Sequence, residues 1–304
     1  MSDKASKGLV PPAAQADATA PIRREPRLAW LRQLAGNPLG LAGLILVVLI
    51  VFSAVAADLI APYDYKALDV KIRLSGPTWD HLLGTDNLGR DTFSRSLFGG
   101  RVALTVALVS VSLSLFIGLV LGMMAGYGPR KLDNVLLLLF DSVRAFPTIM
   151  FALAVITVIG PSLQTVIAVV VITSVPAYAR IVRTQTMALK NTEFILAERS
   201  LGAGNMRVMF SHIVPNVIAP LLILASMDIP VVITIEAGLS FLGLGVKPPT
   251  PSWGSILSDG YSFIRDTPWM IAAGGIPLIL TTLGFTFLGE ALRDVFDPKL
   301  SKDR

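Results

Sequence analysis

The chain of 304 residues contains no cysteine and only two histidines, His81 and His212. Without cysteine, a disulfide framework, a thiolate metal site and a cysteine nucleophile are all excluded. Two histidines leave few options for a zinc site or for imidazole catalysis. Charged residues are scarce as well, at 15% of the chain against about 25% in an average soluble domain. These shortages argue against a soluble metalloenzyme.

Nucleotide-binding and hydrolase motifs are also missing. The sequence has no G-x-x-x-x-G-K-[ST], so we predict that the chain itself binds no ATP through a P-loop. It has no G-x-S-x-G and no H-E-x-x-H. The lone Gly-Ala-Gly at 202–204 follows no predicted strand, so it is not a dinucleotide fingerprint. We therefore predict that the chain is not an enzyme and holds no cofactor or metal of its own.

Apolar residues make up 53% of the chain, and the mean hydropathy is +0.67. A helix that spans a membrane needs about 20 mostly apolar residues. The candidate runs are 34–57, 102–128, 145–179, 213–246 and 267–289. The third run has 35 residues, and Gly160-Pro161-Ser162 divides it into two helices, of which the first reaches back to about Leu132. The sequence predicts an all-α integral membrane protein with six transmembrane helices.

The distribution of basic residues predicts the orientation of these helices. Six spans place both termini on one side, and the segments on that side hold 18 of the 26 Lys and Arg residues. The positive-inside rule therefore makes the termini cytoplasmic, and we read the net charge of +5 as topology rather than as nucleic-acid binding. The expected organisation is a mobile cytoplasmic tail (1–36), a first helix (37–61), an extracytoplasmic loop (62–100), a core of five helices (101–291) with a cytoplasmic loop (185–216), and a cytoplasmic tail (292–304). The first helix is expected to be retained, because the basic region before it is too long for a secretory signal.

A polar segment at 193–216 interrupts the apolar pattern on the cytoplasmic side. Thr192 is placed to cap a short helix with one apolar face, Gly202 to end that helix in a left-handed conformation, and Asn205 to cap a second short helix. The apolar face is formed by positions at helical spacing: Phe194, Ala197 and Leu201. The connection has roughly 30 residues where two helices usually need 2–8. Such a loop is either an interfacial connector or a docking surface.

The segment "ILAERSLGAGNMRVMFSHIVPN" resembles the cytoplasmic EAA signature loop of ABC importer permeases. With Gly202 aligned to the signature glycine, Ala197 stands at the first alanine and Pro215 at the proline. Leu196 replaces the signature glutamate, and Glu198 replaces the second alanine. The resemblance implies that this loop couples the permease to an ATPase, through the following residues: Ala197, Glu198, Gly202, Ala203 and Pro215. Whether Glu198 substitutes for the missing signature carboxylate is open at this stage.

Further segments resemble the peptide-type permeases, namely the "C" subunits of dipeptide, oligopeptide, nickel and glutathione importers. They are "HLLGTDNLGRDTFSRSLFGGRVAL" (81–104), "EAGLSFLGLGVKPPTPSWGSIL" (236–257), "NPLGLAGLILVVLIVFSAVAADLIAPYD" (37–64) and "LRDVFDPKL" (292–300). The resemblance implies a type I importer in the bacterial inner membrane. Its expected partners are a homologous second permease, two cytoplasmic ATPases that bind ATP and Mg, an extracytoplasmic solute-binding protein and the lipid bilayer. The expected solute is a di- or oligopeptide.

Two alternatives to a peptide importer follow from the same sequence. One is a nickel or glutathione importer of the same family. The other is a self-contained secondary transporter or channel, which many folds build from repeated halves, and no such repeat is evident here. Co-purification with ATPases and a second permease separates an ABC importer from the self-contained transporter or channel.

Charged residues within the predicted spans are candidates for a pathway or gate, because a charge at the membrane centre costs about 2.5–3.5 kcal/mol on insertion scales. Asp141 and Arg144 are expected near the cytoplasmic end of the third span, either as a local i,i+3 pair or as part of an inner gate. Pro147 predicts a kink one turn later. Asp228 is expected midway along the fifth span, where it lines the pathway and meets an ammonium group or a metal cation, or is protonated, or bonds to backbone freed by Pro230. Glu236 is expected nearer the outer end of that span. The outer loops carry Trp79 and Trp253, which are expected to contact the binding protein or to anchor in the membrane interface.

Overall fold

The computed structural model describes residues 36–296. The predicted tail 1–36 lies outside the described residues except for residue 36, whereas 292–296 of the predicted tail 292–304 belong to the last helix and only 297–304 lie outside. Every regular element within 36–296 is helical, and two residues, Thr85 and Asp91, form an isolated β-bridge. The elements are α2 (Pro38–Val55), α3 (Ala57–Ile60), a 3₁₀ turn η1 (Val70–Ile72), α4 (Thr92–Tyr127), α5 (Arg130–Arg144), α6 (Thr148–Ile159), α7 (Leu163–Leu189), α8 (Glu193–Ser200), α9 (Asn205–Val208), a π-helical turn η2 (Met209–Ile213), α10 (Val214–Phe241), α11 (Trp253–Ser262) and α12 (Trp269–Phe296).

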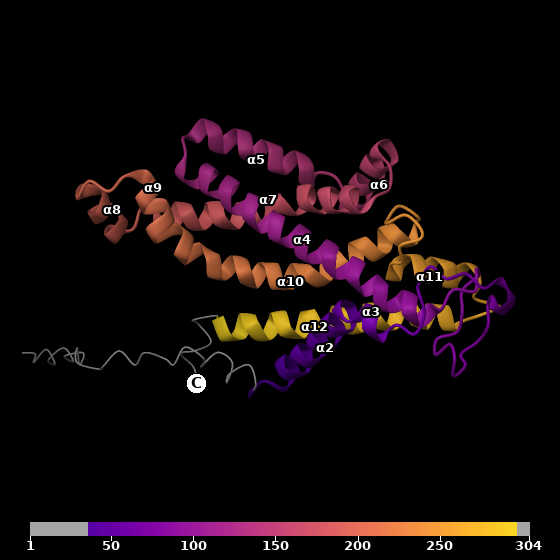
Figure 1. Cartoon of the computed structure of the whole chain (residues 1–304). Coiled ribbons are helices and arrows are strands. Elements are labelled where there is room, and N and C mark those ends of the chain that lie inside the picture. The colour runs from indigo at the N-terminus through magenta and orange to yellow at the C-terminus, as the bar shows by residue number, and fades with distance from the viewer. Residues whose placement is uncertain (1–35, 297–304) are drawn as a thin grey trace, which may run out of the picture.

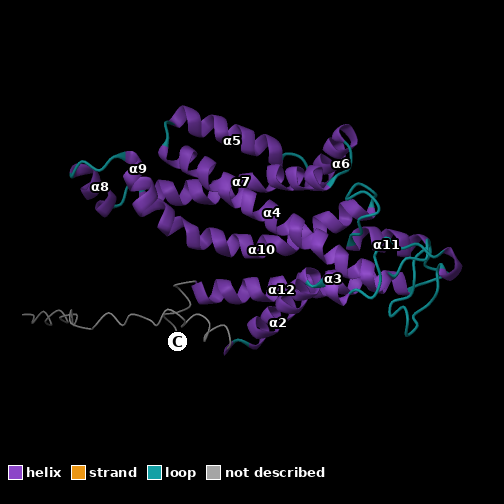
Figure 2. Cartoon of the chain, in the orientation of Figure 1, coloured by secondary structure: helices purple, strands orange, loops and turns teal. Residues whose placement is uncertain are grey.

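The long helices form an elongated bundle with different structures at its two ends (Figure 1). One end carries α8 and α9, and the other carries α11 and the long connection between α3 and α4, which Figure 2 shows as loop. Five helices are long and apolar enough to cross a membrane, and the bent pair α5–α6 raises the number to six if it counts as one span. The predicted all-α architecture with up to six spans is therefore confirmed for residues 36–296.

The third predicted helix is broken rather than kinked. α5 ends at Arg144, α6 begins at Thr148, and the two helices meet at 87°. Pro147 causes the break, since proline has no N–H to donate and disfavours helical geometry at Phe146. The 15 residues of α5 rise about 20 Å from the cytoplasmic side before the chain turns. Asp141 and Arg144 lie in the last turn of α5, directly before the break, and both are exposed in the single chain.

Two helices extend into segments that were expected to be loops. α4 begins at Thr92, so the last nine residues of the expected loop 62–100 are helical, and Asp91 caps the helix by accepting from the Ser94 N–H at 2.7 Å. α11 lies within the expected loop 247–266, and it begins with a capping box between Ser252 and Ser255. The charged residues at the start of α4 hid its helical character, because hydropathy alone cannot detect a buried ion pair.

The two tryptophans of the outer loops have different environments. Trp79 is 97% exposed, whereas Trp253 is 2% exposed and its Nε1–H donates to the Ser96 carbonyl at 2.9 Å. Anchoring in the membrane interface, one of the two readings for these residues, is therefore wrong for Trp253. This side chain fixes α11 against the first turns of α4.

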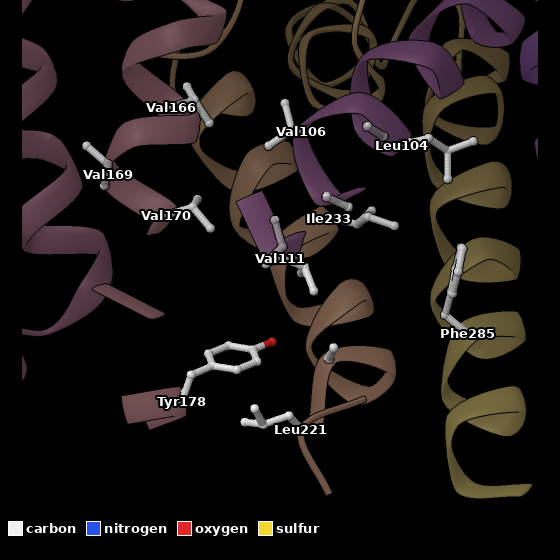
Figure 3. Close-up of a cluster of buried hydrophobic side chains, with 14 of the residues drawn as sticks. Leu104, Val106, Val111, Val166, Val169, Val170, Tyr178, Leu221, Ile233 and Phe285 are labelled. Atoms are coloured by element: carbon white, nitrogen blue, oxygen red, sulfur yellow. The ribbon is translucent and has the colours of Figure 1, made fainter. Parts of the chain in front are cut away.

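The core is centred on α4, which packs most extensively against α7 (Figure 3). Val166, Val169 and Val170 of α7 and Val106 and Val111 of α4 belong to the same buried cluster. Toward the cytoplasmic side the two helices approach closely along three glycines of α4 at a spacing of four residues, namely Gly118, Gly122 and Gly126. Small residues at this spacing let two backbones come into contact.

Replacing Gly122 with alanine is expected to destabilise the bundle. A Cβ atom at Gly122 would lie 2.5 Å from the Ala179 carbonyl oxygen and 2.5 Å from the Val182 Cβ, so α4 and α7 must move apart. Overpacking of this kind costs about 1–3 kcal/mol and should lower the melting temperature of the purified protein. Gly275→Ala is the control, since its Cβ would meet only Leu257 Cδ2, at 3.6 Å. Equal melting temperatures for the two variants would contradict the close approach.

Candidate functional site

The polar segment 193–216 forms two short helices joined by a left-handed glycine. The φ angle of Gly202 is +90°, as predicted for the residue that ends α8. The Ala203 N–H donates to the Glu198 carbonyl at 3.0 Å and the Gly202 N–H to the Arg199 carbonyl at 2.9 Å, which is a Schellman motif. Residues other than glycine rarely adopt this φ, so Gly202 fixes the direction in which the chain leaves α8.

The predicted side-chain caps of these helices are wrong. Thr192 occupies the cap position of α8, but its hydroxyl donates to the Leu189 carbonyl at 2.7 Å and makes no capping bond. The cap position of α9 belongs to Gly204, and the Asn205 side-chain oxygen accepts from the Tyr127 hydroxyl at 3.0 Å. Asn205 is thus engaged by the end of α4, a tertiary contact that local sequence rules do not include.

The apolar face predicted for α8 is open to solvent, and a different residue packs inward. Ile195 is buried in the core, whereas Ala197 is exposed and Leu201 is 86% exposed. Further exposed apolar side chains of the segment are Phe194, Leu196, Met206 and Phe210. Helical spacing revealed an apolar stripe, but spacing cannot distinguish a stripe that packs on its own chain from one that is open to a partner. We call the exposed set Phe194, Leu196, Ala197, Leu201, Met206 and Phe210 the cytoplasmic apolar surface.

The rest of the segment is tied to the membrane helices. The Glu198 carboxylate lies 3.3 Å from His212 Nε2 in η2, directly before α10. Arg199 Nη2 donates to the Tyr127 hydroxyl at 2.6 Å, at the end of α4. Ala203 packs against the core, while Pro215 is exposed in the first turn of α10. Glu198 therefore has a partner within its own loop.

A second feature is a cavity of about 340 Å³ that is open on one side, since its lining includes exposed residues such as Arg144, Phe146 and Val231. Its walls come from the α5–α6 break, from α7 and from α10, and they include Arg144, Pro147, Tyr178 and Asp228. The Tyr178 hydroxyl donates to Asp228 Oδ2 at 3.2 Å, and Figure 3 shows this hydroxyl directed toward α10. Two of the four sequence-predicted pathway residues, Arg144 and Asp228, are thus brought to one cavity.

The other two predicted pathway residues lie elsewhere. Asp141 forms an ion pair with Arg180 of α7, so the predicted local pair of Asp141 with Arg144 is wrong. One helical turn separates the two residues on α5, but α7 presents a guanidinium that reaches Asp141 across the helix interface. Glu236 is 1% exposed, accepts from the Ser240 hydroxyl at 2.6 Å and does not line the cavity.

The outer end of the bundle is held by a buried ionic cluster. Asp86 is 1% exposed, and its Oδ2 lies 2.6 Å from Arg90 Nε and 3.3 Å from Arg95 Nε. Asp259 of α11 lies 3.8 Å from Arg95 Nη2. Burial raises the pKa of the Asp259 carboxyl, and the arginines oppose this shift. The cluster joins the outer loop to α4 and α11.

Several residues of these sites were not found from the sequence. Tyr127 and Tyr178 received no role, because each contacts a partner at least 50 positions away along the chain. The glycine spacing in α4 was a signal that could have located the α4–α7 contact before the structure. Arg180 lies just beyond the apolar run 145–179, but α7 continues through it to Leu189.

Two family profiles match the chain, on either side of residues 78–117. The profile of the "Binding-protein-dependent transport system inner membrane component" family matches residues 118–302. The profile described as "N-terminal TM domain of oligopeptide transport permease C" matches residues 27–77.

Individual relatives agree with these profiles. The chain is 38% identical to a dipeptide transport system permease protein of Alkalihalophilus pseudofirmus, over 95% of this chain and 94% of the relative. It is 37% identical to a di/tripeptide transport system permease protein of Pseudomonas aeruginosa, over 90% and 93%. It is 39% identical to a glutathione transport system permease protein of Pectobacterium atrosepticum, over 92% and 93%.

A solved structure has the same fold. A chain of the MetNI methionine ABC transporter, in an inward-facing conformation, matches with a TM-score of 0.53 and 20% identity. The match covers 66% of this chain and 95% of that chain. The likeness confirms the predicted fold class, that of a type I ABC importer permease.

Proposed function

Because the chain belongs to the family of inner membrane components of binding-protein-dependent transport systems, and is a multi-pass permease subunit of the bacterial inner membrane, we propose that it forms half of a pathway for small peptides. Partner ATPases supply the energy, and this chain binds neither ATP nor Mg. A homologous second permease supplies the other half of the pathway, and an extracytoplasmic binding protein delivers the solute. The names of two relatives, which are dipeptide and di/tripeptide permeases, support the choice of solute.

The cytoplasmic apolar surface carries this proposal. It combines exposed apolar side chains with the small residue Ala197 at the end of the bundle, while Ile195 and Val208 anchor the same helices in the core. A groove on an ATPase can grip such a helix closely. The contacts of Arg199 with Tyr127 and of Glu198 with His212 then pass its movement to α4 and α10. Within the coupling residues, Ala197 supplies the contact, Gly202 the angle, and Glu198, Ala203 and Pro215 the connection to the membrane helices.

The mechanism requires a permease with two states. ATP closes the ATPases on the cytoplasmic side, and the loaded binding protein biases the permease from the outside. The movement enters through α8 and reaches the cavity through α10, which carries Asp228. We assign Asp141, Arg144, Asp228 and Glu236 to the pathway or its gates, and of these four Arg144 and Asp228 line the cavity.

The proposal is tested by purification and transport. This chain should purify with a second permease and two ATPases, and the complex should take up small peptides only with ATP and the binding protein. A glutathione importer is the second candidate, because one relative of 39% identity is a glutathione permease. Uptake of glutathione but not of dialanine would favour the glutathione importer. Uptake by this chain alone in liposomes would contradict the proposal as a whole.

A further inference from the structure

Two opposite charges in the cavity have no ionic partner among residues 36–296. Asp141, Asp133, Arg180 and Arg183 pair with one another between α5 and α7, whereas neither Asp228 nor Arg144 takes part in any ion pair of the described residues. The hydroxyl of Tyr178 is neutral and contacts only Oδ2 of Asp228. Charges at this depth in a membrane are costly unless they are compensated. No described side chain pairs with either charge, so both are free to contact a molecule in the cavity.

The walls between the two charges suit a small organic solute. Thr173 and Ser174 add hydroxyl groups, and most other lining residues are apolar, among them Val143, Leu224 and Ile235. Apolar walls with a few polar groups are typical of small-molecule sites, and the volume of about 340 Å³ lies near the lower limit of such pockets.

The positive and the negative charge lie on different helices, so a bound solute with two charged ends would have one preferred orientation in the cavity. Arg144 ends α5 on one wall, and Asp228 lies in α10 on another. A guanidinium presents a planar pair of donors that matches a carboxylate. The Asp228 carboxylate keeps Oδ1 for a second donor, because Tyr178 contacts Oδ2.

We propose that this cavity binds solutes as zwitterions, with Asp228 accepting hydrogen bonds from the ammonium group and Arg144 donating to the carboxylate. The inference rests on the proposed function and goes further, because it assigns recognition of the solute's two ends to this permease and not only to the binding protein. A metal cation fits poorly, since Arg144 places a positive charge in the site. Residues 36–296 also contain no cluster of three or more Asp, Glu, His or Cys side chains that could hold one.

The test measures binding to the permease–ATPase complex in nanodiscs, with the binding protein left out. Radiolabelled dialanine is displaced by unlabelled dialanine, by its N-acetyl form and by its C-terminal amide. Asp228→Asn should lower the affinity for dialanine and for the amide about tenfold and leave the affinity for the N-acetyl form unchanged. Arg144→Gln should lower the affinity for dialanine and for the N-acetyl form about tenfold and leave the affinity for the amide unchanged. Tenfold corresponds to the loss of one hydrogen bond between charged groups.

Controls separate recognition from folding. Asp228→Glu and Arg144→Lys should restore part of the affinity, and Glu290→Gln, an exposed carboxylate on α12, should change none of the three affinities. Equal losses for all three peptides in both variants, or no saturable binding of dialanine to the wild-type complex, would overturn the inference. ATP-driven uptake with the binding protein present is measured separately. If peptide uptake is intact but the two variants do not differ in their selectivity for the N-acetyl form and the amide, the inference alone is refuted. If the wild-type complex takes up no peptide, the proposed function is refuted.

Discussion

Replacing Gly202 with valine is expected to lower ATP-driven uptake by the assembled transporter at least about tenfold while its ATPase activity persists. The φ of +90° at this position is one that a β-branched residue rarely adopts, at a cost of roughly 1–2 kcal/mol or more. The loop relieves this strain by changing the angle between α8 and α9. A shift of 1.4 kcal/mol is a factor of about ten in the population of the correct loop. The ATPases then turn over without moving α4 and α10.

Gly204→Val is the matched control for this experiment. Gly204 lies two positions later, has a φ of −71° that any residue adopts, and has no atom within 4 Å of the Cβ position. Uptake and hydrolysis should stay coupled in this variant. Ala197→Trp provides a second route to uncoupling, because it blocks close contact at the cytoplasmic apolar surface without changing the backbone. If Gly202→Val kept uptake and hydrolysis coupled as in the wild type, the assignment of this loop would be wrong.

Asp86→Ala should strongly destabilise the outer end of the bundle. The substitution leaves Arg90 and Arg95 buried without their nearest carboxylate. It also removes the acceptor of the Leu88 and Arg90 backbone N–H groups, at 2.8 and 3.0 Å. Removing one partner of a buried pair costs about 3–5 kcal/mol. The melting temperature of the purified complex should fall on the order of 10 °C.

Asp64→Ala serves as the comparison for Asp86→Ala. Asp64 is an exposed carboxylate of the same outer loop, and its Oδ1 accepts from only one backbone N–H, that of Lys66 at 2.9 Å. Its loss should change stability by no more than about 0.5 kcal/mol. Equal melting temperatures for Asp86→Ala and Asp64→Ala would show that Arg90 and Arg95 find other partners or water.

The features predicted correctly from the sequence depend on neighbours along the chain. The apolar runs located the spans because each run fills a membrane by itself. Gly202 was identified because it directly follows the last apolar position of α8, where a left-handed cap is common. Pro147 marked the place where the third span changes direction, although the size of the change, 87°, depends on packing that the sequence does not display.

The features that were missed depend on partners far away in the sequence. The pairing of Asp141 with Arg180, and of Tyr178 with Asp228, joins helices that meet only after folding. The start of α4 at Thr92 was not predicted, because a hydropathy profile counts Arg95 and Asp86 as two separate charges, whereas in the structure they form an ion pair. Which apolar side chain of α8 is covered could not be predicted, because Ile195 and Leu201 are both apolar and only the folded core, which contains Ile195, distinguishes them.

The break at Pro147 also determines which side of the subunit can meet lipid. A helix that stops inside the bilayer leaves backbone carbonyls without helical partners, and hydrocarbon cannot satisfy them. The corner between α5 and α6 must therefore face protein or water in the assembled transporter. The surface of α2, where Ile45, Val48, Leu49 and Phe52 are exposed, has no such requirement and can lie against acyl chains. A single imino acid thus gives the subunit an inner and an outer side, and it limits the rotations at which a second permease can dock.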